Sequence, residues 1–350
     1  MPKANGTIGS WAIALWSFSR PHTIIGTTLS VVGLWVMALS FGHFKYETVG
    51  VSGEGDLWSI SLILVAAWFT CIAGNVYIVG LNQLTDVEID RINKPHLPLA
   101  SGDFSQTMGL LLVGLTGAIA LSFSLFQGPF LMATVWASLL IGTVYSLPPI
   151  RLKRFPFWAS VCIFTVRGVI VNLGLFLHFS DRLSAPIVDA PIMGAPIVNI
   201  SVVNALASNE AIVDILGLSW QIPIAVWLLT AFVLVFTFAI AIFKDIPDIE
   251  GDRKYHITTF TVKLGAKAVF NVARWVITVC YLGTIVGAWL LSPLNAVAFL
   301  LFHGAVLTIF WILSWRVDLG DQKAIAQFYQ FIWKLFFLEY LAFPVLTWAS

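Results

Sequence analysis

The chain has 350 residues, of which 59% are hydrophobic and only 11% are charged, with a formal net charge of +1. About a quarter of the residues of an average soluble domain are charged. The composition therefore excludes an ordinary soluble protein, an intrinsically disordered chain and a nucleic-acid-binding protein. A membrane-spanning helix needs about 20 mostly apolar residues, so long windows without charge predict the membrane spans.

The charge-free windows predict nine spans in chain order. One span is expected in each of 21–44, 57–85, 155–180, 215–243 and 324–350, and two in each of 104–150 and 275–315. Turn-forming residues at 127–129 and 292–295 divide the two longer windows. The runs lack the two-residue alternation of outer-membrane strands. We therefore predict an all-α polytopic membrane protein, with nine transmembrane helices forming a single domain over residues 1–350.

The basic residues predict the orientation of these spans. Nine spans place successive connections on alternating sides, and the side with more lysine and arginine is cytoplasmic. The outer side carries only Lys45 and Arg182. The other side carries fourteen: Lys3, Arg20, Arg91, Lys94, Arg151, Lys153, Arg154, Lys244, Arg253, Lys254, Lys263, Lys267, Arg316 and Lys323. The N-terminus is therefore predicted to be cytoplasmic.

One outer connection, residues 181–219, is long and contains Ala-Pro-Ile three times at a five-residue spacing. We interpret it as a low-complexity insertion without a chemical role. The alternative is a short amphipathic segment that lies on the outer membrane surface.

Seven of the 18 acidic residues lie in two short windows, 82–91 and 244–253. Both windows contain the pattern Asp-x-Glu-x-Asp-Arg, at 86–91 and at 248–253. Each window ends a predicted span, the second and the sixth, on the predicted cytoplasmic side. A single such cluster would be interpreted as a solvated helix end, whereas a matched pair on one side indicates a shared site.

The spacing within the windows suits a metal. If the second predicted helix continues through its window, Asn82, Asp86 and Asp90 lie on one helix face. The second window offers a similar set in Asp245, Asp248 and Asp252. Pro247 is expected to break the helix there. Because Mg²⁺ takes oxygen ligands and bridges carboxylates to substrate phosphates, the two windows predict a Mg²⁺ site for a diphosphate.

A basic stretch, 145–154, follows the fourth predicted span. Its Arg151, Lys153 and Arg154 suit phosphate oxygens that the metal does not reach, and a positive-inside anchor explains them equally well. Arg167 differs, because it lies inside the fifth predicted span, where an ionisable group is expensive and indicates a functional site. The alternative for Arg167 is a place in a buried polar network.

A diphosphate site at the mouth of a helical membrane bundle indicates a lipid diphosphate substrate. Mg²⁺ and basic residues would stabilise charge on the leaving diphosphate. If the lipid is allylic, its carbocation can be stabilised by aromatic walls, and 14% of the residues are aromatic. Exclusion of water would let an organic acceptor capture that cation. These features together predict prenyl transfer.

The same residues resemble a known family. Asn-Gln-x-x-Asp-x-x-x-Asp at 82–90 and Asp-x-x-Asp-x-x-x-Asp at 245–252, with nine helices, are similar to the UbiA superfamily of intramembrane prenyltransferases. Five segments resemble its homogentisate prenyltransferase branch, above all the cyanobacterial phytyl-transferring members: 19–28, 93–102, 145–154, 243–252 and 328–340. The resemblance covers nearly the whole chain except the Ala-Pro-Ile loop.

The resemblance implies nine helices around a central cavity and a specific reaction. A phytyl group would pass from phytyl diphosphate to homogentisate with Mg²⁺ as cofactor and loss of CO₂ and diphosphate. The product would be 2-methyl-6-phytyl-1,4-benzoquinol, for tocopherol biosynthesis. The resemblance further implies membrane lipids as surroundings and a cyanobacterial thylakoid or plasma membrane as location. No protein partner is predicted.

Carried over by position, the resemblance also implies roles for single residues. The metal ligands would be Asn82, Asp86, Asp90, Asp245, Asp248 and Asp252, and Tyr145 would join Asp86, Asp90, Asp248 and Asp252 as catalytic residues. Lys153 and Arg154 would bind the diphosphate. To these we add Arg91, Lys94 and Arg151 as diphosphate ligands, and Arg20, His22 and Arg167 as our own candidates for holding the acceptor carboxylate. Gln83 stands where many relatives outside this branch have Asp, so the first motif is expected to bind metal through Asp86 and Asp90.

Three alternatives remain open. Within the family, the donor could be solanesyl or geranylgeranyl diphosphate, or the acceptor a chlorophyllide. A cation or proton transporter usually places its acidic groups near the bilayer midplane, whereas these windows lie at predicted span ends. A non-catalytic scaffold offers no reason for a repeated acidic motif.

Overall fold

The computed structural model describes residues 8–41, 54–183, 198–201, 210–215, 218–247, 249–254, 259–290 and 295–348. For residues 8, 54–57, 156, 198–201, 210–215, 218–221 and 250–252 it describes the backbone alone. All structural statements below refer to these residues.

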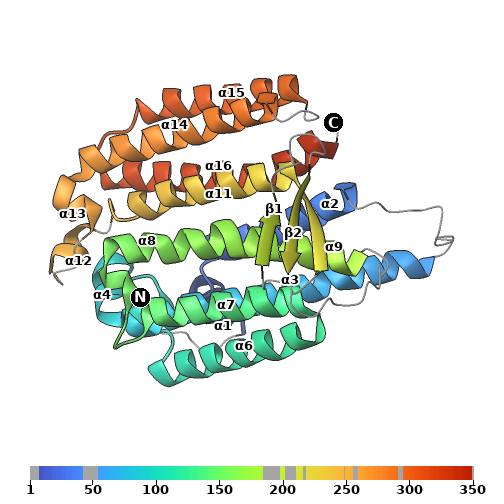
Figure 1. Ribbon diagram of the computed structural model, residues 1–350. Helices are drawn as coiled ribbons and strands as arrows, with labels where there is room; N and C mark the ends of the chain where they lie inside the picture. Colours follow the sequence, from blue (N-terminus) through green and yellow to red (C-terminus); the bar gives the residue numbers. More distant parts are fainter. Residues whose placement is uncertain are drawn as a thin grey trace.

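Nine helical spans in the described chain are long and apolar enough to cross a membrane, as predicted. They are α2 (Pro21–Phe41), α3 (Glu54–Thr85), α6 (Gln106–Phe126), α7 (Pro129–Ser146), the composite of α8 (Pro156–Phe164), η2 (Thr165–Ile170) and α9 (Val171–Leu183), then α11 (Ile224–Phe243), α14 (Ala266–Leu290), α15 (Ala296–Ser314) and α16 (Gln322–Trp348). Figure 1 shows the spans side by side in one bundle, with α14 and α15 at one flank and α6 at the other. The prediction of a helical polytopic membrane protein is confirmed.

Local sequence explains where several spans begin and end. α6 and α7 are joined at Gly128, whose φ of 105° is a conformation that glycine adopts without steric cost. Pro129 then occupies the first turn of α7, where its missing N–H costs nothing. The predicted break at Pro247 is also found, because α11 ends at Phe243 and residues 244–247 form a turn.

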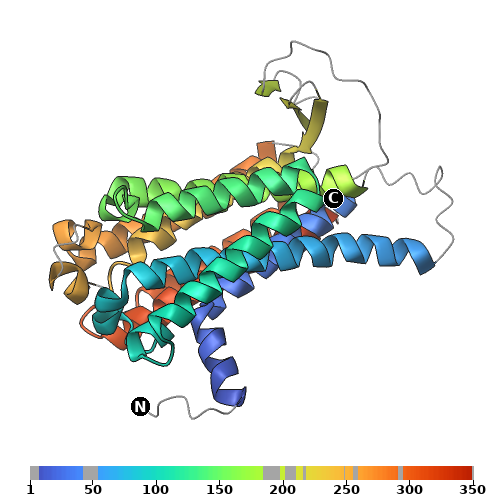
Figure 2. The same cartoon turned by 90° about the horizontal axis from the view of Figure 1, so that it is seen from below.

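α11 lies inside its predicted window, 215–243, and begins well after the start of that window. Residues 218–223 form a strand of a small antiparallel sheet, and the helix begins only at Ile224. The strands are β1 (Val198–Ser201), β2 (Glu210–Ile215) and β3 (Leu218–Pro223), in the order β1-β2-β3. Figure 2 shows them outside the bundle. The predicted loop 181–219 thus includes the end of α9 and most of this sheet, while its three Ala-Pro-Ile copies lie outside the described residues.

The start of α14 also differs, because the helix begins at Ala266 and not near residue 275. It therefore includes Arg274, which directly precedes the charge-free window 275–315. The Arg274 guanidinium carbon lies 4.3 Å from the ring centroid of Trp311 on α15 and 5.5 Å from that of Phe270. Stacking on aromatic rings allows an arginine to lie on an otherwise apolar helix.

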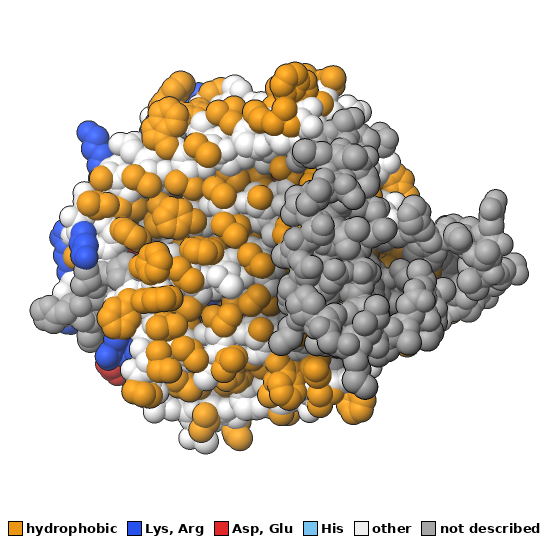
Figure 3. Space-filling view, in the orientation of Figure 1, with side chains coloured by type: hydrophobic (Ala, Val, Ile, Leu, Met, Phe, Trp, Pro, Cys, Tyr) orange, Lys and Arg blue, Asp and Glu red, His pale blue; other side chains and the backbone are white. Residues whose placement is uncertain are grey.

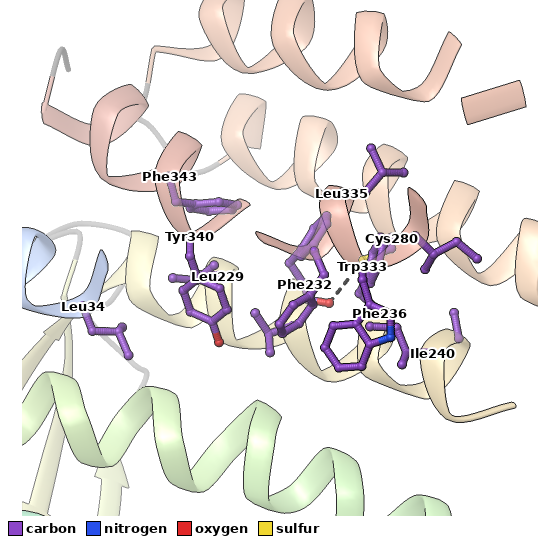
Figure 4. Packing of buried hydrophobic residues seen from close by; sticks show 14 of the residues in the cluster. Leu34, Leu229, Phe232, Phe236, Ile240, Cys280, Trp333, Leu335, Tyr340 and Phe343 are labelled. Atoms are coloured by element: carbon purple, nitrogen blue, oxygen red, sulfur yellow. Dashed lines mark hydrogen bonds between the residues drawn. The ribbon is translucent and has the colours of Figure 1, made fainter. Parts of the chain in front are cut away.

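The core is built around α11, the most buried of the spans. Phe236 of α11 lies 6.0 Å from Phe336 of α16, and Phe232 lies 6.3 Å from Phe343, measured between ring centroids. Figure 4 shows side chains from both helices meeting in one apolar layer. Since lipid is as apolar as these rings, close packing rather than exclusion from water holds such helices together.

Small residues let the backbones approach. A Cβ atom built on Gly33 of α2 would lie 2.5 Å from the carbonyl oxygen of Tyr340 on α16. That distance is well inside van der Waals contact, so only glycine allows α2 and α16 to pack this closely.

The short elements α4 (Val87–Asn93), η1 (Leu152–Arg154), α12 (Ile249–Lys254) and α13 (Phe260–Leu264) gather at one end of the bundle, called the motif end below. α1 (Ile8–Phe18) and α5 (Pro98–Ser101) complete the described helices. Figure 3 shows apolar side chains across the bundle face and lysine and arginine at the motif end. The C-terminus lies at the opposite end.

Candidate active site

The fold brings the two acidic windows together at the motif end. The first window runs from the end of α3 through α4, and the second runs from the turn after α11 through α12. α4 and α12 pack against each other. Asp248 lies outside the described residues and the side chain of Asp252 is not described, so the second window is placed here by its backbone and by Asp245 in the turn.

The first window does not form the continuous helix face on which the predicted stacking of Asn82, Asp86 and Asp90 depends. α3 ends at Thr85, and Asp86 caps α4 with φ −121° and ψ 16°. The helix breaks here because the basic segment 145–154 binds both the Thr85 carbonyl and the Asp86 carboxylate. Arg151 Nη2 donates to the Thr85 carbonyl at 3.1 Å and to Asp86 Oδ1 at 2.8 Å.

Lys153 completes this cluster. Its Nζ donates to Asp86 Oδ2 at 2.7 Å and to the Thr85 hydroxyl at 2.7 Å. The side chains of Lys153 and Asp86 are only 11% and 14% exposed, and ion pairs shielded from water in this way are stronger than surface pairs. Burial lowers the pKa of Lys153 to about 8, against the opposing effect of Asp86. The ammonium group is therefore still mostly charged at neutral pH.

Two arginines in a left-handed backbone conformation flank the first motif. Arg20 has φ 54° and Arg151 has φ 42°, and they are the only non-glycine residues with positive φ in the described chain. Arg20 Nη2 lies 4.0 Å from Asp90 Oδ2, as Arg151 lies beside Asp86. Such backbone strain persists where the surroundings fix it, and it clusters at functional sites.

The other predicted diphosphate ligands lie closer to the surface. Arg91 pairs with Glu88 at 2.7 Å, but the two side chains are 56% and 65% exposed, and exposed pairs contribute little. Arg154 is exposed at the end of η1. Lys94 caps the C-terminus of α4 through its backbone N–H, which donates to the Asp90 carbonyl at 2.7 Å.

Tyr145, at the end of α7, connects the basic segment with the second acidic window. Its hydroxyl oxygen accepts a hydrogen bond from Lys244 Nζ at 3.5 Å. Lys244 directly precedes Asp245, so it adds a cation to the acidic window from within. Sequence reasoning gave Lys244 no role at the site, although its position beside Asp245 was the available signal.

The three candidates for an acceptor carboxylate do not lie together. Arg20 faces Asp90, whereas His22 and Arg167 both contact the indole ring of Trp333. The ring centroids of His22 and Trp333 are 5.0 Å apart. The Arg167 guanidinium carbon lies 4.9 Å from the ring centroid of Trp333. Sequence reasoning gave Trp333 no role, although it lies in 328–340, one of the five segments that carry the family resemblance.

Gln83, where an aspartate is expected in other branches, has a structural role. It is buried, and its Nε2 donates to the Phe18 carbonyl at 2.7 Å and to the Val79 carbonyl at 3.3 Å. The side chain thus connects the end of α1 to α3 and points to the backbone rather than to the acidic cluster.

The described donors suit a hard divalent cation. No group of three or more His, Cys, Asp or Glu gathers within the part of the chain whose side chains are described, which leaves out Asp248 and Asp252. Asp86 and Asp90 offer carboxylate oxygens, and α12 brings the second acidic window against them. An all-oxygen donor set next to cationic side chains is typical of Mg²⁺ bound together with a phosphate.

Comparison with known proteins agrees with this geometry. Residues 47–335 match the model of the UbiA prenyltransferase family. The chain is 46% identical to the homogentisate phytyltransferase of Synechocystis sp., over 96% of each chain. It is 33% identical to the chloroplastic homogentisate solanesyltransferase of Arabidopsis thaliana, over 95% of this chain and 76% of that one.

Solved structures show the same fold. A UbiA homolog from Archaeoglobus fulgidus, bound to GPP and Mg²⁺, superposes with a TM-score of 0.55 at 14% identity, over 95% of this chain and 99% of that chain. The paired acidic windows, the nine spans and these likenesses agree, and the protein belongs to the UbiA family of membrane prenyltransferases.

Proposed function

We propose that the protein is a homogentisate phytyltransferase, which transfers the phytyl group of phytyl diphosphate to homogentisate. The observation that carries this proposal is the 46% identity with the Synechocystis enzyme of that name along nearly the whole of both chains. The clustering of Arg151 and Lys153 on Asp86 supports it, because a prenyl diphosphate needs both cations and metal-binding carboxylates.

The proposed reaction balances in its bonds and protons. The allylic C–O bond of phytyl diphosphate breaks, and its electron pair leaves with diphosphate. A ring carbon of homogentisate bonds to the prenyl carbon and loses its proton, while the side-chain carboxylate leaves as CO₂ and the remaining methylene gains a proton. The product is 2-methyl-6-phytyl-1,4-benzoquinol.

The residues divide between metal and diphosphate. Asn82, Asp86 and Asp90, together with Asp245, Asp248 and Asp252, would hold Mg²⁺. When bound, Mg²⁺ would neutralise the negative charge that develops on the leaving diphosphate. Arg151 and Lys153 would bind the remaining phosphate oxygens, with Arg91, Lys94 and Arg154 at the surrounding surface. Tyr145 would lie near the reacting carbon.

The position of Arg20 beside Asp90 favours the diphosphate rather than the acceptor as its ligand. A cation 4.0 Å from a motif carboxylate would bind a phosphate oxygen of the diphosphate that Mg²⁺ would neutralise. His22 and Arg167 remain the candidates for the acceptor.

The motif end is proposed to face the cytoplasm, because lysine and arginine gather there (Figure 3) and basic residues mark the cytoplasmic side. The surrounding lipid would belong to a cyanobacterial thylakoid or plasma membrane. Phytyl diphosphate would keep its tail within the bundle and bring its head group to the motif end.

An assay with three donors tests the proposal. The purified protein in lipid nanodiscs, with Mg²⁺ and homogentisate, is expected to use phytyl diphosphate in preference to geranylgeranyl and solanesyl diphosphates. Liquid chromatography with mass spectrometry identifies each prenylated quinol. Preference for solanesyl diphosphate would replace the proposed donor, and no turnover of homogentisate with any donor would refute the proposal.

A further inference from the structure

The fifth span contains a turn of π-helix, η2, which carries Arg167. Turns of this kind are rare and often occur at functional sites. Buried polar groups hold this one in place. Asn172 Nδ2 donates to the Gly168 carbonyl at 2.8 Å, and the Tyr340 hydroxyl donates to Asn172 Oδ1 at 2.8 Å. Because Asn172 and Tyr340 are fully buried, the turn is fixed rigidly to α16.

Arg167 has aromatic neighbours and no acidic one. Its guanidinium carbon lies 4.9 Å from the ring centroid of Trp333 and 5.4 Å from that of Phe336. Among the residues whose side chains are described, no carboxylate forms an ion pair with it. Arg167 nevertheless stays partly exposed, although both rings are buried. A cation inside a membrane bundle normally has an anionic or polar partner, and ring stacking leaves its charge uncompensated.

Arg167 adjoins the diphosphate side of the site. His22 of α2 packs against the same indole ring as Arg167, and two residues earlier Arg20 faces Asp90. One helical turn after His22, Gly26 packs close to Arg167. A Cβ atom there would lie 3.7 Å from Arg167 Nη1. Contacts therefore run from the acidic motif inward along the start of α2 to Arg167.

We propose that Arg167 binds the carboxylate of the aromatic acceptor and that the acceptor ring lies beside Trp333 and His22. This inference rests on the proposed function, which makes the acceptor an aryl acid. A guanidinium group presents two parallel N–H donors to a carboxylate, and the pairing fixes the direction of the attached ring. Arg167 thereby selects acceptors that carry a carboxylate and holds them on the inward side of the diphosphate.

Binding of the acceptor without a prenyl donor tests the inference. Homogentisate and its methyl ester are titrated onto the nanodisc-embedded protein and followed by isothermal titration calorimetry. The unmodified protein is expected to bind the acid at least ten times more tightly than the ester. Arg167→Gln is expected to weaken binding of the acid by about 10-fold to 100-fold and to leave binding of the ester nearly unchanged.

Arg274 provides the matched control, because it is also an arginine in a span that stacks on a tryptophan. Arg274→Gln is expected to keep the preference for the acid. Mg²⁺-dependent binding of inorganic pyrophosphate shows that the motif end of each variant is intact. Should Arg167→Gln keep the preference for the acid while binding pyrophosphate normally, the inference is overturned.

A panel with 4-hydroxybenzoate separates this inference from the proposed function. Binding of 4-hydroxybenzoate in place of homogentisate, with the same dependence on Arg167, supports the inference and refutes the proposed acceptor. Turnover of homogentisate, together with an unaltered preference of Arg167→Gln for the acid over the ester, supports the proposed function and refutes the inference. If the unmodified protein binds neither acid, both are refuted.

Discussion

The Lys153 ammonium group donates a hydrogen bond to the Asp86 carboxylate at 2.7 Å, although 67 residues separate them in the chain. This contact joins the basic segment after α7 to the first acidic motif. It places a cation where a bound diphosphate would need one, directly beside a carboxylate that would bind its metal. The predictions below follow from this arrangement and from its surroundings.

Lys153→Gln is expected to lower kcat/KM for phytyl diphosphate by about 10-fold to 100-fold. The reason is the loss of a charge-assisted hydrogen bond, worth roughly 2 kcal/mol. Steady-state kinetics with varied donor concentration measures the change. Lys323→Gln removes an exposed lysine at the start of α16 and serves as control. Equal activity of the two variants would show that Lys153 does not bind the diphosphate.

Asp86→Asn is expected to lower transfer by about 10³-fold or more, because it removes the carboxylate charge that would bind Mg²⁺ and pair with Lys153. Glu88→Gln changes a carboxylate two residues away that is 65% exposed, and it is expected to keep nearly full activity. Turnover over a range of Mg²⁺ concentrations compares the two. An Asp86→Asn enzyme with the activity of Glu88→Gln would contradict the metal assignment.

Gln83→Leu is expected to destabilise the protein by about 1–3 kcal/mol, because the Phe18 carbonyl loses a buried donor. The Mg²⁺ concentration for half-maximal activity should stay unchanged. Asn82→Ala is expected to show the reverse, a raised Mg²⁺ requirement with little loss of stability. Thermal unfolding and Mg²⁺ titration measure both variants. A shifted Mg²⁺ requirement in Gln83→Leu would show that Gln83 belongs to the metal site.

Tyr340→Phe removes the hydrogen bond to Asn172, which in turn holds the turn that carries Arg167. One neutral hydrogen bond contributes about 1 kcal/mol, so the KM for homogentisate should rise roughly 3-fold to 10-fold. The KM for phytyl diphosphate should not change. Tyr281→Phe alters an equally buried tyrosine of α14 and is the control. Equal acceptor KM values in both variants would argue against a positioning role for Tyr340.

The spans were largely predictable, because charges are so scarce that their gaps identify the membrane segments. Two helices begin away from the starts of their windows, for physical reasons. Residues 218–223 suit a strand as well as a helix, and they pair in the sheet. The charge-free window 275–315 begins directly after Arg274, whereas the stacking of Arg274 on Trp311 lets the helix begin earlier.

The site was predictable in its residue types but not in its geometry. The spacing of Asp86 and Asp90 implied one helix face only for a continuous helix, and contacts with Arg151 and Lys153 break that helix. These contacts come from a segment more than 60 residues away, which no local pattern reveals. Trp333 lies in a segment that carries the family resemblance, but its contacts with His22 and Arg167 come from tertiary packing.

The stoichiometry of the reaction tests the central claim most directly. Homogentisate labelled with ¹⁴C at its carboxyl group is incubated with phytyl diphosphate, Mg²⁺ and the protein in nanodiscs. We expect labelled CO₂, diphosphate and unlabelled 2-methyl-6-phytyl-1,4-benzoquinol in equal amounts, and none of them when EDTA removes the metal. Diphosphate release without labelled CO₂ or a prenylated quinol would contradict the account.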